Sequence, residues 1–460
     1  MIRVFRVHIA TPILVLGLAD VLILCFSIVA GYAFSYLSIS LGISTFRANI
    51  DVCVVYVGAI VVSLIMMGLY QRQFVADLKI TFLRMLASFA AAVFLLSVIF
   101  YIFPHMRIWL SALLPALFVG IAGVFATRMI FLRISDISAL KRRILVFGAG
   151  RQARELEAME HQGGFLCVGF LPIDGTDLAV RRGRVLRYDK PLNEIVSDLD
   201  ADEVVVALQE RRGRVPSEDL LACRMQGVPI TDFWTFIERQ KGQVELDALN
   251  PSWMIFAEGF SSRSRLQRMA KRTFDIIASL LLLSFSLPVT LAAALAVYLE
   301  DHGPVFYRQE RVGLYGKTFL LFKFRSMRVD AEKDGVARWA SANDSRVTRV
   351  GAFIRMTRID EIPQIINVLR GEMSFIGPRP ERPIIVSELI DAIPYYGYRD
   401  TVKPGITGWA QVNYPYGASV EDAKQKLKFD LYYIKNYSLM LDCLILLQTV
   451  RVVLWPQGVR

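Results

Sequence analysis

Two adjacent carboxylates, Asp360 and Glu361, lie in a strongly basic part of the C-terminal third of the chain. Four cationic residues accompany them in the surrounding sequence: Lys323, Arg325, Arg355 and Arg379. Cations around carboxylates have a use where a dianionic phosphate must lie between them. Mg²⁺, which prefers oxygen ligands, would relieve the remaining repulsion between carboxylate and phosphate. The pattern predicts a phosphate-handling site with Mg²⁺ at Asp360 and Glu361.

The segment DEIPQIINVLR, which begins with this pair, predicts a helix that ends at Gly371. Asp360 is expected to be its N-cap, with Glu361 in the first turn and Pro363 tolerated there. Free N–H groups at a helix N-terminus favour phosphate and an ionised carboxylate. The structural alternative is that Asp360 is only a cap and Glu361 only a partner of the helix dipole. The surrounding cations favour the chemical role.

Several segments around these residues resemble the bacterial sugar transferase family, the monotopic polyprenyl-phosphate phosphoglycosyl transferases. They are KFRSM, RVTRVGAFIRMTRIDEIPQIINVLRGEMSFIGPRP, KPGITGWAQVN and DLYYIKNYSLMLDCLILLQTV. The resemblance covers about residues 268–455, and the motifs occur in the family's order. The layout of the whole chain resembles the large members, which start exopolysaccharide, capsule or O-antigen units with UDP-glucose or UDP-galactose.

The resemblance implies that Asp360 is a nucleophile that attacks the sugar-bearing phosphorus, expels UMP and holds the phosphosugar until undecaprenyl phosphate takes it. Glu361 would assist metal binding or proton handling. The residues expected to contact substrate or metal are Lys323, Arg325, Arg355, Arg379 and Asp430. The expected partners are a UDP-sugar, undecaprenyl phosphate, membrane lipid and a second copy of the chain.

Three other functions stay open from the sequence. A transferase that moves the sugar without its phosphate would release UDP instead of UMP. An inactive or regulatory membrane scaffold would sense a nucleotide through the middle domain. Nucleic-acid binding would use the net charge of +11, but no recognition helix is evident and membrane topology explains the N-terminal basic residues. We therefore expect no nucleic-acid partner.

The first 134 residues contain four apolar stretches, at about 13–34, 52–69, 82–103 and 110–132. Hydrophobic residues make up 54% of the chain and charged residues 21%, which makes a purely soluble enzyme improbable. Basic residues that include Arg84 and Arg128 flank one side of the stretches, so the positive-inside rule places the N-terminus and the residues directly after 134 in the cytoplasm, at a bacterial inner membrane. No paired ionisable residues are evident in the spans, which predicts an anchor or an interaction platform.

The segment RILVFGAGRQAREL in the middle of the chain predicts a strand, a glycine-rich turn and a helix. Gly148 and Gly150 fit the first two glycines of a dinucleotide fingerprint, and Asp174 stands near the position that would hold a ribose. Alternating strands and helices predict an open, mostly parallel sheet. The alternative is a domain without a ligand, because small residues pack strand against helix in either case. Residues 232–265 are expected to form a linker that packs on the membrane surface or on a neighbouring domain.

An apolar run at 276–297 is long enough for a fifth span, but Pro288 lies in its middle, close to Ser286. A plain span would place the basic motifs outside the cell, away from nucleotide-activated substrates. A re-entrant helix–break–helix hairpin over 272–299 keeps them in the cytoplasm, with Lys271 and Arg272 at the lipid headgroups. Ser286 and Pro288 resemble the family's helix-breaking pair, with Leu287 between them.

The sequence therefore predicts a multidomain membrane protein. A four-helix transmembrane bundle occupies residues 1–140, and a Rossmann-like α/β domain with its linker occupies 141–265. A mixed, mostly α catalytic domain occupies 266–460, with the re-entrant hairpin and interfacial helices. The stretch 439–455, which is apolar but carries charged residues, is expected to be one interfacial amphipathic helix.

Overall fold

The computed structural model forms two compact units. Apart from short pieces at 5–7 and 65–68, one unit ends at Glu245 and the other runs from Leu246 to Arg460. The described residues are 2–4, 7–9, 11–70, 78–135, 141–160, 164–172, 178–208, 216–249, 259–260, 264–329, 346–415, 417 and 419–454.

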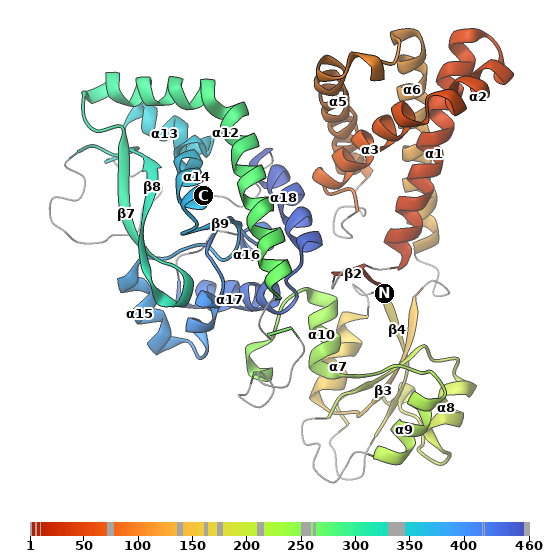
Figure 1. Ribbon diagram of the computed structural model, residues 1–460. Helices are drawn as coiled ribbons and strands as arrows, with labels where there is room; N and C mark the ends of the chain where they lie inside the picture. The colour runs from red at the N-terminus through yellow and green to blue at the C-terminus, as the bar shows by residue number, and fades with distance from the viewer. Residues whose placement is uncertain are drawn as a thin grey trace. The chain divides into compact units, whose positions relative to one another are not determined.

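The N-terminal unit begins with two short strands and a set of apolar helices (Figure 1). The elements are β1 (Ile2–Val4), β2 (Val7–Ile9), α1 (Thr11–Tyr36), α2 (Ile39–Ala48), α3 (Ile50–Met66), α5 (Leu78–Ile102) and α6 (Leu110–Ser135). Helices α1, α5 and α6 are long and apolar enough to span a membrane, which confirms three of the predicted stretches. The remaining stretch, at 52–69, forms α3, which has 17 residues. Helix α3 meets α2, which was not predicted, at an angle of 89°.

Helices α1 and α6 approach each other closely because small residues line their contact. A Cβ atom on Gly31 would lie 2.3 Å from the carbonyl oxygen of Ala112 and 2.8 Å from the Cβ of Ala116. Such small-residue contacts are typical of helix packing in membranes. Large apolar side chains on another side of α1, including Leu22 and Phe26, are mostly exposed, as expected for a surface that faces lipid.

The interior of the helical bundle contains a fully buried ion pair, so the prediction that the spans contain no paired ionisable residues is wrong. Both Asp20 of α1 and Arg128 of α6 have completely buried side chains, and Arg128 Nη2 lies 2.7 Å from Asp20 Oδ2. Tyr70 Oη and Thr127 Oγ1 also donate to Asp20, at 2.7 and 3.1 Å. Arg128 is therefore an interior residue of the bundle. The sequence had placed it among the basic residues that flank the spans. Arg84 of α5 is also buried.

We expect Asp20→Asn to destabilise the helical bundle, because it leaves the buried Arg128 charge without its counter-ion. Removing one partner of a buried ion pair costs about 3–5 kcal/mol. The thermal unfolding temperature of the detergent-solubilised protein should fall. Asp51→Asn, at an exposed acidic residue in the first turn of α3, is the matched control and should leave this temperature unchanged. Equal unfolding temperatures for both variants would contradict the expectation.

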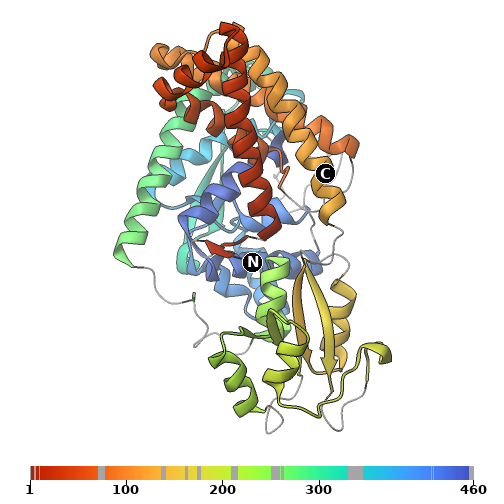
Figure 2. The ribbon, with the colours of Figure 1, turned by 90° about the vertical axis from the view of Figure 1, so that its right-hand side faces the viewer.

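The second part of this unit is an α/β domain with a parallel sheet. Its elements are β3 (Arg142–Phe147), α7 (Arg151–Met159), β4 (Phe165–Leu171), α8 (Leu192–Asp198), β5 (Glu203–Val206), α9 (Ser217–Met225), β6 (Ile230–Asp232) and α10 (Phe233–Lys241). The strand order is β4-β3-β5-β6, and all neighbouring pairs are parallel, as predicted. One apolar core joins the sheet to α7 and α10, and a second joins it to α8 and α9, so helices cover both faces (Figures 1 and 2).

The glycine-rich turn after β3 lies where the strand order reverses, because β4 pairs with one edge of β3 and β5 with the other. Gly148 has φ +125°, and a Cβ atom there would lie 2.3 Å from the carbonyl oxygen of Ala207, so glycine is required. Gly150 has open space around it. Asp174 lies outside the described residues.

The predicted linker at 232–265 is wrong for its first part. Asp232 caps α10 by accepting hydrogen bonds from the backbone N–H groups of Trp234 and Thr235. Phe233 and Phe236 are completely buried in the core on one face of the sheet. The alternation of aromatic and polar residues in this stretch is therefore that of an amphipathic helix that belongs to the α/β domain.

The C-terminal unit consists of two short sheets, each of two strands, and the helices around them. Its elements are α12 (Arg265–Asp301), β7 (Phe306–Val312), β8 (Thr318–Phe324), α13 (Arg349–Met356), the 3₁₀ segment η6 (Ile359–Gln364), α14 (Ile365–Arg370), β9 (Ser374–Ile376), α15 (Pro383–Ala392), η7 (Tyr396–Thr401), β10 (Gly405–Thr407), α16 (Trp409–Asn413), α17 (Val420–Lys435) and α18 (Leu439–Leu454). Strands β7 and β8 are antiparallel, whereas β9 and β10 are parallel.

Helix α12 bends part-way along its length (Figure 1), and its helical conformation is continuous over 37 residues. The structure thus has a bend where the sequence predicted a break. Pro288 removes one backbone donor, which explains a bend in this region. Thr290 Oγ1 donates to the carbonyl oxygen of Ser286 at 2.8 Å, and such a bond back to the preceding turn also favours a bend.

The first arm of α12 is held by buried polar contacts. Lys271 Nζ lies 2.9 Å from Asp442 Oδ2 of α18, and Asp275 accepts a hydrogen bond from Ser374 Oγ at 2.9 Å. Arg272 donates to the carbonyl oxygens at the end of α14. Lys271 is therefore a buried internal residue and not a headgroup contact as predicted. Asp442 of α18 is likewise completely buried, although the sequence placed that helix at an interface.

Candidate active site

The dyad of Asp360 and Glu361 lies in the 3₁₀ segment η6, and not at the N-cap of an α-helix as predicted. Arg358 precedes η6 in the left-handed conformation, with φ +60°. Pro363 has no N–H group and its ring crowds the preceding turn, so the α-helical bonding pattern begins only with α14. The helix does end where predicted, because Gly371 is its C-cap with φ +84°.

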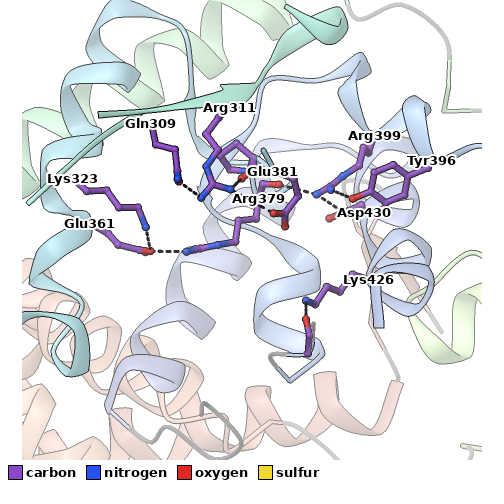
Figure 3. Close-up of polar contacts among 12 residues, drawn as sticks. Gln309, Arg311, Lys323, Glu361, Arg379, Glu381, Tyr396, Arg399, Lys426 and Asp430 are labelled. Carbon is purple, nitrogen blue, oxygen red and sulfur yellow. Dashed lines mark hydrogen bonds and ion pairs between the residues drawn. The ribbon is translucent and has the colours of Figure 1, made fainter. Parts of the chain in front are cut away.

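Glu361 is paired with two cations through a single oxygen atom (Figure 3). Lys323 Nζ lies 2.9 Å and Arg379 Nη2 2.6 Å from Glu361 Oε1. Burial by itself would raise the pKa of Glu361, but Arg379 and Lys323 together hold it well below the ordinary value. The Glu361 carboxylate is therefore held in its ionised form by two cations in direct contact with it.

Asp360 is in a different state, although it is the next residue. Its side chain is only 7% exposed, and none of the hydrogen bonds between described residues reaches its carboxylate. Burial and the charge of Glu361 raise its pKa, while the charges of Lys323, Arg355 and Arg358 oppose this rise. The structure thus brings the predicted Arg355 to the dyad. It also brings Arg358, which was not predicted to be a site residue. Asp360 is the dyad carboxylate with free oxygen atoms.

A buried asparagine fixes the strand that carries Lys323. Asn367 of α14 accepts a hydrogen bond from the backbone N–H of Phe322 at 3.0 Å and donates to the carbonyl oxygen of Leu320 at 2.7 Å. Its amide thus bonds to β8 as a neighbouring strand would. Because α14 follows η6 directly, this contact sets the position of Lys323 relative to the dyad. The feature of the sequence that could have revealed this contact is an asparagine on the apolar side of the predicted helix.

A second buried network positions Arg379 (Figure 3). Arg399 Nη2 donates to the carbonyl oxygen of Arg379 at 2.8 Å and lies 3.1 Å from Asp430 Oδ2. Burial raises the pKa of Asp430 to about 6, although Arg399 opposes the rise. Asp430, which was predicted to lie near metal and substrate, is thus paired with Arg399, which also holds the backbone of Arg379. Arg399 was not selected from the sequence.

Further cations surround the segment GPRPER that carries Arg379. Arg311 Nη1 donates to the carbonyl oxygen of Pro380 at 3.0 Å, and its Nη2 donates to Gln309 Oε1 at 2.6 Å. Burial lowers the pKa of Arg311, which Glu381 opposes, while the charges of Arg379 and Arg382 lower it further. Arg311 Nη1 also lies 3.5 Å from Glu381 Oε2, so part of this positive charge is already balanced.

The remaining predicted site residues lie elsewhere. Arg325 is bonded to Asp301 at the end of α12, and it also reaches the carbonyl oxygen of Val297. Ser286 and Pro288 lie within α12. Gly148 and Gly150 belong to the α/β domain of the other unit. The structure therefore brings together Asp360, Glu361, Lys323, Arg355 and Arg379.

The donor set of the dyad fits a magnesium ion. Among the described residues no group of three or more His, Cys, Asp or Glu side chains forms a metal site. Mg²⁺ does not need such a group, because it commonly binds through one or two carboxylates, water and substrate phosphates. The oxygen atoms of Asp360 and the second oxygen of Glu361 would be the carboxylate ligands of such an ion.

The family described as "Bacterial sugar transferase" matches residues 266–456. The undecaprenyl-phosphate galactose phosphotransferase of Salmonella typhimurium is 31% identical over 365 residues, which cover 71% of each chain. The chain belongs to the bacterial sugar transferase family. A second relative in this family is the UDP-N-acetylgalactosamine-undecaprenyl-phosphate N-acetylgalactosaminephosphotransferase of Aeromonas hydrophila, 38% identical over 294 residues and 64% of each chain.

A third bacterial sugar transferase, the UDP-glucose:undecaprenyl-phosphate glucose-1-phosphate transferase of Escherichia coli K12, is 45% identical over 189 residues. The aligned part covers 41% of this chain and 40% of the relative. The chain thus spans 64% of the length of the Aeromonas protein and less than half of the Escherichia coli protein. The residues that match the family and the dyad both lie in the C-terminal unit.

Lys323→Met should raise the pKa of Asp360 further in this sugar transferase, because Lys323 is one of the charges that lower it. Carbodiimide attacks protonated carboxyl groups, so labelling of Asp360 followed against pH by mass spectrometry reports its pKa. In the unmodified protein the midpoint should lie above 3.8, and in the variant at a still higher pH. Lys317→Met, at an exposed residue, is the control. A midpoint that Lys323→Met does not move would contradict the electrostatic account.

Proposed function

We propose that this protein transfers a sugar 1-phosphate from a UDP-sugar to undecaprenyl phosphate through a covalent intermediate on Asp360, and releases UMP. This would be the first membrane step in the synthesis of an exopolysaccharide, capsule or O-antigen. The three named relatives transfer glucose, galactose or N-acetylgalactosamine phosphates by their names. We propose a UDP-hexose as donor, with UDP-glucose and UDP-galactose as the first candidates.

The difference in hydrogen bonding between the two dyad carboxylates is the observation that supports the proposal. Oε1 of Glu361 is paired with Lys323 and Arg379, whereas the Asp360 carboxylate accepts no hydrogen bond from the described residues. A nucleophile needs lone pairs that are not committed to other donors. Of the two carboxylates, Asp360 meets this requirement. The nearby cations would bind the phosphates and favour its ionised form.

The proposed first step forms a bond between a carboxylate oxygen of Asp360 and the sugar-bearing phosphorus. The bond from that phosphorus to the bridging oxygen breaks, and UMP leaves with the electron pair. In the second step an oxygen of undecaprenyl phosphate attacks the same phosphorus, and the Asp360 carboxylate leaves. The product is a polyprenyl-diphosphate sugar, and no proton is gained or lost by Asp360 overall.

Arg379 and Arg355 would hold the phosphates in line for these two displacements, and Lys323 would stabilise the charge that spreads over the phosphoryl oxygens. Mg²⁺, held by Asp360 and Glu361, would neutralise negative charge on the diphosphate. Glu361 would keep Lys323 and Arg379 in place through its shared oxygen. Asp430 and Arg399 would act as positioning residues for Arg379.

We propose that the bent helix α12 is re-entrant, so that the dyad faces the cytoplasm, where UDP-sugars are made. The exposed apolar side chains of α12, among them Leu281 and Phe285, support its insertion in lipid. Both the bend near Pro288 and the need for a nucleotide substrate favour return to the same side. The α/β domain is proposed to be Rossmann-like, because its ligand-binding turn would lie at the reversal of strand order. A homodimer stays a prediction.

Asp360→Asn should abolish turnover and prevent the covalent adduct, because an amide is a far weaker nucleophile. The test incubates the membrane protein with UDP-sugars and measures UMP release, then searches for the phosphosugar mass on the peptide that carries residue 360. Arg325→Gln is the comparison at a cation outside the dyad, and it should keep the adduct. UDP release would favour sugar transfer without phosphate, and release of neither nucleotide would favour the scaffold.

Removal of divalent metal should stop turnover. Activity measured as UMP release should fall to background in chelator and return when Mg²⁺ is added in excess. Calcium, which is larger and prefers more ligands, should restore less activity. Full activity in chelator would refute the metal assignment and leave the nucleophile assignment standing, because Asp360→Asn tests that separately.

A further inference from the structure

Two cations converge at the end of α14 that is remote from the dyad. If a Cβ atom stood on Gly371, Lys403 Nζ would lie 3.5 Å from it and Arg272 Nη2 3.7 Å from it. The two charged groups therefore lie around one point. Helix α14 and the end of η6 separate this point from the dyad by roughly 15 Å.

Neither cation is balanced by an acidic partner in contact with it. Arg272 donates to the carbonyl oxygens of Val368 and Leu369, each at 2.6 Å, and forms no ion pair within the described ranges. Lys403, which is half-buried, has neither a hydrogen bond nor an ion pair among the residues that the structure describes. Burial and the charge of Arg272 lower the pKa of Lys403, while the more distant charge of Asp275 opposes the shift.

Such an arrangement is costly without an anion. Two like charges that each lie within 3.7 Å of one point repel each other, and a half-buried ammonium without an acceptor among the described residues loses hydration. An oxyanion placed between Lys403 and Arg272 would remove both costs. A phosphate group suits this position, because its oxygen atoms accept from a guanidinium and an ammonium at the same time.

The position along α12 identifies the source of the phosphate. The first strongly exposed apolar residues after Arg272 are Ile277, Leu280 and Leu281, each at least half exposed. At 1.5 Å per residue, Arg272 lies about 8 Å before Ile277 along the helix axis. The headgroup layer of a bilayer is about 5–8 Å thick on each side of the hydrocarbon core. When the apolar arm lies in hydrocarbon, Arg272 and Lys403 lie at the level of the lipid phosphates.

We propose that Lys403 and Arg272 form a binding site for the phosphate of an anionic membrane lipid, separate from the dyad. The bound headgroup would fix the depth of α12 and, through Arg272, the end of α14. A soluble phosphate ion offers the same oxygen atoms, but the adjoining apolar surface of α12 favours a lipid. The site does not depend on which reaction occurs at Asp360.

Lysine acetylation of the full-length protein in lipid nanodiscs tests the proposal. The discs contain phosphatidylcholine alone, phosphatidylcholine with an equal amount of phosphatidylglycerol, or phosphatidylcholine with added inorganic phosphate. Mass spectrometry compares the acetylation rates of Lys403 and of the exposed Lys317. Phosphatidylglycerol should slow acetylation of Lys403 about fivefold relative to Lys317. In native mass spectra, Lys403→Gln should retain fewer phosphatidylglycerol molecules than the matched Lys317→Gln.

Equal acetylation of Lys403 in all three discs would overturn the site. Protection by inorganic phosphate with no further protection by phosphatidylglycerol would overturn the lipid assignment. Lys403→Gln removes no contact between described residues, so a loss of lipid in this variant reports binding and not misfolding. A normal phosphatidylglycerol count in that variant would also contradict the proposal.

Discussion

One carboxylate oxygen, Oε1 of Glu361, holds the candidate active site together. It is reached by Lys323 from β8 and by Arg379 from the segment after β9, so two parts of the C-terminal unit meet at one atom. Two adjacent carboxylates would repel each other in a buried place. Balancing one of them with two cations lets the other remain close by. Two further contacts support this arrangement. Asn367 bonds to β8, which carries Lys323, and Arg399 bonds to the backbone of Arg379.

The chemical part of this site could be predicted from the sequence, whereas its supports could not. Adjacent carboxylates among cations are visible as residue types and spacing, and the structure does place Lys323 and Arg379 at the dyad. Lys323 and Arg325 look equivalent in KFRSM, but β8 ends at Phe324, and Arg325 turns to Asp301. Arg399 carries no motif of its own. Its role appears only when the backbone of Arg379 is in place.

The fold shows the same division between local and distant information. Apolar length predicted α1, α5 and α6, and alternation predicted the strands of the α/β domain, because both patterns are complete within one segment. Asp20 and Arg128 are 108 residues apart, so no window of the sequence contains both. Asp20 looks like an isolated charge within the first apolar stretch, and Arg128 looks like one near the end of the last. Pro363 similarly looked compatible with a first helical turn, and only the backbone showed that the α-helix begins after it.

The Asp20–Arg128 pair also constrains how the N-terminal helices are made. Asp20 is synthesised in the first long helix and Arg128 in the last, with α2, α3 and α5 between them. During translation the first helix must therefore enter the membrane before its counter-ion exists. An unpaired aspartate in hydrocarbon is costly. Until α6 is made, Asp20 lacks the contacts that Arg128 and Thr127 provide, so the bundle closes only when its final helix has been delivered.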